Sequence, residues 1–152
     1  MNLQTQWIVG FVDGEGCFHI AINKNDMCSS GYQVLPEFTV TQHVKDIKVL
    51  YALKEYFGCG VVRKNHGDRY CFRVRRFQHL QEKIVPFFEK HKLKTCKRIE
   101  FEKFRSVLII MQKKQHLELE GFTRIREIQQ QMNRKAKNLR ESPAFYENQK
   151  ID

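Results

Sequence analysis

The chain has 152 residues, with 27 Lys and Arg against 17 Asp and Glu, and a formal net charge of +10. This length suits one compact domain with a real core, but it is small for an enzyme that handles a long substrate unless two copies act together. The longest apolar run, residues 107–111, is too short to span a membrane. The five cysteines are odd in number and lack CxxC spacing, which argues against both a zinc site and a disulfide framework.

The positive charge is concentrated in the middle of the chain. Residues 61–105 hold 14 Lys and Arg against 5 Asp and Glu. Aromatic residues are interleaved with these charges, as at Tyr70, Phe72, Phe77 and Phe101, which indicates a folded basic surface rather than a disordered tail. Nucleic acid is therefore the expected partner, and a membrane is not.

The first predicted helix begins near Asn2 to Thr5, either of which can cap it, and ends around Asp13. Its residues Trp7, Gly10, Phe11 and Gly14 share one face. Two helical glycines cost about 2 kcal/mol relative to alanine, so this face predicts close approach of a second helix. Asp13 and Glu15 then fall at a junction between this helix and a strand.

Two hairpins and several helices follow. Residues 18–25 and 37–41 alternate apolar and polar side chains and predict antiparallel strands, joined by a polar turn at 25–31. Residues 46–57 predict a helix that Gly58 ends. Residues 61–76 predict a second hairpin with a turn at 65–68, and its second strand carries a row of outward arginines that suits phosphates and bases.

The remaining residues predict mainly helices. Residues 80–88 are helical with Pro86 as a local disturbance, and 95–111 form a second helix with Ile99, Phe101, Phe104, Leu108 and Met111 available for burial. Thr123 can cap a final amphipathic helix to about residue 139. We expect one domain over residues 1–141 and a flexible tail over 142–152.

The stretch IVGFVDGEG at residues 8–16 and the order of elements resemble the LAGLIDADG homing endonuclease family. The resemblance implies an α+β, αββαββα fold, in which a saddle-shaped antiparallel sheet lies on DNA beneath a helical layer, with additional C-terminal helices here. Because the motif occurs once, it implies a homodimer whose motif helices pack at the two-fold axis. The expected interface residues are Trp7, Gly10, Phe11, Asp13 and Gly14.

The same resemblance assigns the site. Glu15 is the implied metal ligand, with the Gly14 carbonyl as a further oxygen donor and Asp13 supporting the helix end. Carboxylates are suitable hard ligands for Mg²⁺, the expected cofactor. Gln42 matches the polar residue that orients solvent, and Lys94 matches the lysine that stabilises charge at phosphorus.

One position departs from the family pattern. A basic residue is common in close relatives four positions after the glutamine, and here that position is Asp46. Lys45 or Lys48 can substitute for it.

Outward strand positions are expected to read double-stranded DNA, because a two-stranded ribbon fits the major groove and Arg, Asn and Gln can pair with base edges. The expected DNA-binding residues are His19, Ala21, Asn23, Asn25, Gln33, Glu37, Thr39, Arg63, Asn65, Arg69, Cys71, Arg73 and Arg75.

The leading hypothesis is a Mg²⁺-dependent, homodimeric, site-specific endonuclease that cuts both strands of a long pseudo-palindromic target, as intron-encoded homing endonucleases do. Two alternatives remain: an RNA-binding maturase that acts on its own intron, and an inactive DNA-binding regulator. Residues 1–6 resemble neither a signal peptide nor an Arg-rich transit peptide. We therefore expect a protein made where it acts, in a mitochondrion or chloroplast or in a bacterial cytoplasm.

Overall fold

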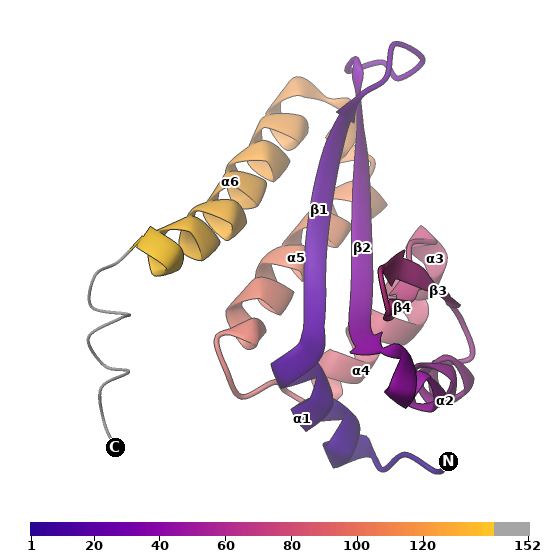
Figure 1. Cartoon of the computed structure of the whole chain (residues 1–152). Coiled ribbons are helices and arrows are strands. Elements are labelled where there is room, and N and C mark those ends of the chain that lie inside the picture. The colour runs from indigo at the N-terminus through magenta and orange to yellow at the C-terminus, as the bar shows by residue number, and fades with distance from the viewer. Residues whose placement is uncertain (142–152) are drawn as a thin grey trace.

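The computed structural model describes residues 1–141, with side chains through residue 132, and has an α+β architecture (Figure 1). Its order confirms the αββαββα prediction with further helices. The main elements are α1 (Thr5–Glu15), β1 (Gly16–Lys24), β2 (Tyr32–His43), α2 (Ile47–Phe57), β3 (Val61–His66), β4 (Arg69–Val74), α3 (Phe77–His79), α4 (Val85–Lys90), α5 (Lys97–Gln112) and α6 (Leu119–Glu141). The expected tail at 142–152 lies outside the described residues. Across the described part, no helix combines the length and apolarity needed to cross a membrane.

The four strands form one antiparallel sheet in the order β1-β2-β4-β3. Gly16 pairs with Val40, and Phe38 pairs with Val74, so the long β2 strand joins the two hairpins. The turn between β1 and β2 lies at the end of these strands opposite to α1 (Figure 1). The end of α1 and the far end of β2 therefore meet at the same end of the sheet.

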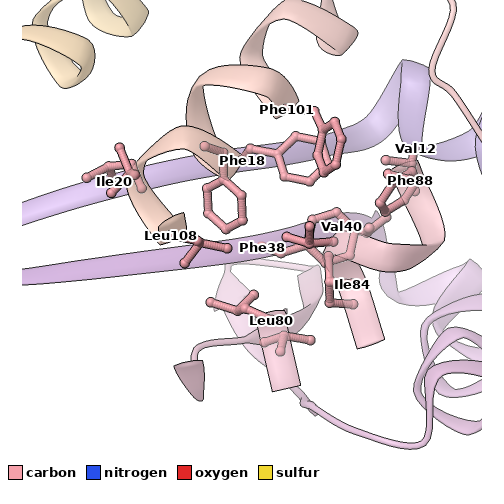
Figure 2. Close-up of a cluster of buried hydrophobic side chains, with 14 of the residues drawn as sticks. Val12, Phe18, Ile20, Phe38, Val40, Leu80, Ile84, Phe88, Phe101 and Leu108 are labelled. Carbon is pink, nitrogen blue, oxygen red and sulfur yellow. The ribbon is translucent and has the colours of Figure 1, made fainter. Parts of the chain in front are cut away.

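One face of the sheet is buried beneath the helices. Alternate residues of β1 and β2, including Phe18, Ile20, Phe38 and Val40, are nearly inaccessible to solvent. They meet side chains of α4, α5 and the preceding turn in one apolar cluster (Figure 2). The rings of Phe18 and Phe38 lie 5.1 Å apart by their centroids, a spacing at which aromatic pairs attract beyond their buried area. The opposite sheet face is left open.

Helix α1 attaches to this core by one side. Ile8, Val9 and Val12 are buried, while Trp7 and Gly10 lie on the exposed side. At the junction with β1, a Cβ on Gly16 would lie 2.6 Å from the Val12 side chain and 2.8 Å from its carbonyl oxygen. Only glycine fits there, so the close turn from helix to strand depends on Gly16.

The structure corrects several predicted helix ends. Helix α1 continues to Glu15, and its N-cap is Gln4 rather than Asn2 or Thr5, because the Thr5 hydroxyl bonds Tyr56 instead. Helix α6 begins at Leu119, and Thr123 lies inside it, where its Oγ1 donates to the Leu119 carbonyl at 2.7 Å. Thr123 is therefore not the cap that the sequence predicts.

Two further predictions in the helical layer need correction or refinement. The sequence makes Ile99 available for burial, but it is 43% exposed because it lies on the solvent side of α5, whose other side buries Phe101 and Phe104. The disturbance predicted at Pro86 is real. A π-helical segment, Leu80–Ile84, directly precedes α4, and Pro86 occupies the first turn of α4, where its missing N–H costs least.

Candidate active site and nucleic-acid interface

The outer face of α1 is apolar and uncovered in the described part of the chain. The Trp7 ring stacks on Phe11 at 4.8 Å, and Trp7 remains 44% exposed. A Cβ built on Gly10 or Gly14 would meet nothing within 4 Å. Packing inside one chain therefore gives no reason for either glycine, and the face is open to a second surface.

Glu15 is the last residue of α1, and both Glu15 and Gly14 are exposed. The end of a helix carries partial negative charge and carbonyl groups without intrahelical donors. A carboxylate at this position gathers further negative charge and oxygen ligands, an arrangement that favours a hard cation. The donor chemistry of Glu15 and Gly14 thus fits Mg²⁺.

A single chain does not complete such a site. Among the described residues, no three His, Cys, Asp or Glu side chains come together in a way that could hold a metal ion. The neighbouring carboxylate, Asp13, is already engaged by hydrogen-bond donors of the same chain. Glu15 is therefore the carboxylate that this chain can offer at the end of α1.

Asp13 joins α1 to the segment before α5. Its Oδ2 accepts from the backbone N–H of Lys94 at 2.9 Å, and its Oδ1 accepts from the backbone N–H and the hydroxyl of Thr95 at 3.2 and 2.9 Å. Burial alone would raise the pKa of this carboxyl, but these bonds and the charge of Lys97 hold the pKa below its ordinary value. The interface contact expected for Asp13 stays a prediction beside this contact within the chain.

The two lysines that flank this contact are placed differently. Lys94 is anchored at Asp13 through its backbone, and the residue is exposed. The Nζ of Lys97 donates to the Gly16 carbonyl oxygen at 2.6 Å and lies 3.8 Å from a carboxylate oxygen of Glu100. Sequence reasoning missed Lys97, although it lies three residues after Lys94 in the same basic segment.

Gln42 lies two residues beyond Val40, the partner of Gly16, and pairs with Tyr70 on β4. It is half-buried and continues the β2 row of Phe38 and Val40. The register therefore brings Gln42 to the end of the sheet where α1 meets β1. Glu15, Gln42 and the Lys94 segment converge on one end of the molecule.

The departure at Asp46 has a clear structural setting. Asp46 ends a short 3-10 turn, Val44–Asp46, and is exposed together with Lys45 and Lys48. The His43 side chain accepts from the Lys45 backbone N–H at 3.1 Å and fixes the start of this turn. Both candidate lysines thus accompany Asp46 directly after β2.

The open sheet face carries the row of side chains predicted to meet DNA. The register places His19 opposite Glu37 and Thr39 opposite Arg73. Arg75 forms an ion pair with Glu37. Desolvation and the charges of Arg75 and Arg63 lower the pKa of Arg73. Such crowding of cations favours the approach of an anion or of acceptor atoms on base edges.

Not every expected residue is equally accessible. Cys71 belongs to the outward row by register but is only 6% exposed, and burial raises the pKa of its thiol. Contact of Cys71 with a base requires its neighbours to move. The same alternation places Cys17 and Thr41 on this face, since Cys17 pairs with Thr39 and Thr41 pairs with Cys71. Extending the period of two by one step in each strand would have found both.

Comparison with known proteins gives a consistent family. Residues 8–108 match the family described as LAGLIDADG endonuclease. The crystal structure of the homing endonuclease I-TnaI superimposes with a TM-score of 0.85 at 56% identity, over 88% of this chain and 90% of that one. The I-SmaMI LAGLIDADG homing endonuclease bound to cleaved DNA superimposes with a TM-score of 0.84 at 33% identity, over 88% of this chain and 46% of that one.

Curated relatives point the same way. DNA endonuclease I-CeuI of Chlamydomonas moewusii is 37% identical over 56% of this chain and 40% of its own length. An uncharacterised 50.9 kDa protein in ND4 intron 1 of Podospora anserina is 32% identical over 76% of this chain. The chain spans only 26% to 40% of the length of such relatives, so it corresponds to a part of them.

Proposed function

This chain belongs to the LAGLIDADG endonuclease family, and from that premise we propose that it is a site-specific, Mg²⁺-dependent homing endonuclease that acts as a homodimer. It cuts both strands of a long, pseudo-palindromic DNA target. The single observation that carries this proposal is the pairing of Glu15 with the open face of α1. An exposed ligand for a hard cation ends the same helix that presents Gly10 and Gly14 to a second surface.

The homodimer follows from the number of carboxylates and from the helix face. One chain offers one Glu15 at this end of the sheet, whereas cutting two strands needs two reaction centres. A two-fold axis along the outer face of α1 brings two copies of Glu15 together and extends the basic sheet over two half-sites. The match to 90% of I-TnaI and to 46% of I-SmaMI supports this view, because the chain equals nearly all of the first protein and about half of the second.

Glu15 and the Gly14 carbonyl would hold the metal, which when bound supplies Lewis-acid stabilisation and a more acidic water. Gln42 orients solvent at the same end of the sheet. Lys94 stabilises negative charge as it builds up at the scissile phosphate. The open sheet face binds the duplex, with Lys and Arg neutralising phosphates and the outward strand side chains contacting base edges.

Cleavage of genomic DNA tests the proposal on all possible target sequences at once. Purified protein is incubated with host genomic DNA in Mg²⁺, in Ca²⁺ or in EDTA, and new ends are mapped by sequencing. We expect paired ends at very few sites in Mg²⁺ alone, and no new ends with Glu15→Gln.

Other outcomes identify the alternatives. Specific DNA binding without cleavage in any metal would overturn the endonuclease proposal in favour of a regulator. Tight binding of the intron RNA together with failure to cut DNA would favour the maturase.

A further inference from the structure

The segment between α4 and α5 is attached to the motif helix through one side chain. Lys94 and Thr95 both donate backbone N–H bonds to Asp13, and the Thr95 hydroxyl adds a third bond at 2.9 Å. These residues are 81 and 82 positions apart from Asp13 in sequence. Asp13 precedes Glu15 by two residues on α1, so the same helix end that carries the metal carboxylate also holds the lysine segment.

Thr95 extends this attachment into α5. Its Oγ1 donates to Asp13 and also accepts from the backbone N–H of Lys97 at 3.2 Å. The Lys97 ammonium then returns to the Gly16 carbonyl at 2.6 Å. The chain of contacts runs from α1 through Thr95 to the start of α5 and back to the start of β1.

We propose that Asp13 and Thr95 are positioning residues, which hold Lys94 at a fixed place relative to Glu15. The inference rests on the proposed function and adds a role that the motif carboxylate Asp13 performs without touching metal or DNA. Its physical basis is that small displacements of a group stabilising charge at a reacting centre are costly, and a shift of about 1 Å can cost about 10²-fold in rate. An exposed lysine on an unattached segment would sample many positions, whereas three hydrogen bonds fix the backbone from which its side chain extends.

Thr95 offers the cleaner test, because it lies away from the outer face of α1 and its substitution leaves that face unchanged. Thr95→Val keeps the shape of the side chain but removes the hydroxyl. Thr95→Ser keeps the hydroxyl. Thr123→Val is the matched control, since it removes a threonine hydroxyl bond of 2.7 Å inside α6. Asp13→Asn is the second variant, because its amide nitrogen cannot accept from the Lys94 backbone.

Three quantities are measured for each variant: single-turnover cleavage in Mg²⁺, DNA affinity in Ca²⁺, and amide hydrogen exchange of residues 92–97. For Thr95→Val and Asp13→Asn we expect cleavage to slow by about 10- to 100-fold, affinity to change by less than about threefold, and exchange at Lys94 and Thr95 to accelerate. Thr95→Ser and Thr123→Val should cleave as the wild type does.

The proposal is overturned if Thr95→Val cleaves at the wild-type rate, if Thr95→Ser is as slow as Thr95→Val, or if cleavage and DNA affinity fall together. It is also overturned if both Thr95→Val and Asp13→Asn fail to fold, since the contacts would then be structural. A wild-type protein that cuts no DNA contradicts the proposed function. In that case wild-type exchange at Lys94 and Thr95 as fast as in the variants separately overturns the positioning role.

Discussion

Lys97 donates from its ammonium group to the carbonyl oxygen of Gly16, 2.6 Å away, at the point where α1 passes into β1. The side chain is 19% exposed, so it is held against the protein rather than extended into solvent. A cation at this place offsets the partial negative charge at the end of α1. The carbonyl that it contacts belongs to the residue directly after Glu15.

Replacement of this lysine should therefore affect both stability and cleavage. For Lys97→Met we expect a lower melting temperature, through loss of the Gly16 contact, and cleavage slowed by about 10-fold or more, through loss of a fixed positive charge. Lys94→Met should slow cleavage without lowering the melting temperature, because Lys94 is anchored through its backbone, which the substitution keeps. Lys103→Met, further along α5, serves as the control. A Lys97→Met protein with wild-type melting and cleavage contradicts this assignment.

Glu15→Gln should separate binding from catalysis. The substitution keeps the shape of the side chain and removes its charge, and Glu15 is exposed, so the fold and the DNA affinity in Ca²⁺ should stay near wild type. Cleavage should fall by more than the roughly 10- to 100-fold typical of residues that only support a metal ligand. Glu55→Gln, an exposed residue of α2, is the charge-matched control. Wild-type cutting by Glu15→Gln would remove Glu15 from the site.

Arg73 tests whether the open sheet face reads sequence. The residue is half-buried between Arg75 and Arg63, so Arg73→Ala removes a positioned guanidinium. A bidentate contact between Arg and a guanine is worth about 1–3 kcal/mol of discrimination against the wrong base. We expect relaxed base preference at one position of each half-site in a cleavage assay on randomised targets. Arg98→Ala, which breaks a pair with Glu102 on α5, should change no preference. Uniform weakening at every base would show that Arg73 binds phosphate instead.

Periodicity explains how far the sequence could predict this structure. The period of two in residues 18–25 and 37–41 located β1, β2 and the outward row, because alternate residues of a strand face opposite sides. The motif at 8–16 placed Glu15 at a helix end. Helix α6 was harder. Its first turn, at Leu119 and Glu120, carries no periodic apolar signal, since Leu119 is 82% exposed.

The contacts of the site were out of reach for a different reason. Asp13 bonds residues 81 and 82 positions away, and no local spacing encodes which backbone amides a carboxylate will accept from. The burial of Cys71 likewise depends on which neighbours cover it, because alternation predicts the face of a residue and not its accessibility. Tertiary packing decides both features.

Gly10→Leu tests the axis of the assembly. A Cβ at Gly10 meets nothing within 4 Å in the single chain, so the variant should fold with a melting behaviour close to that of a monomeric wild type. In a dimer packed through this face the added side chain meets its counterpart, and overpacking of that kind costs about 1–3 kcal/mol or more.

Because two chains share one axis, loss of the dimer should remove double-strand cleavage and weaken DNA binding together. Sedimentation measures the assembly directly, and Glu55→Leu, at an exposed position of α2, controls for added apolar surface. We expect a dimer for the wild type and the control, and a monomer for Gly10→Leu. If Gly10→Leu stays dimeric and cuts normally, or if the wild type is monomeric both free and on DNA, then the two copies of Glu15 do not meet across this helix face.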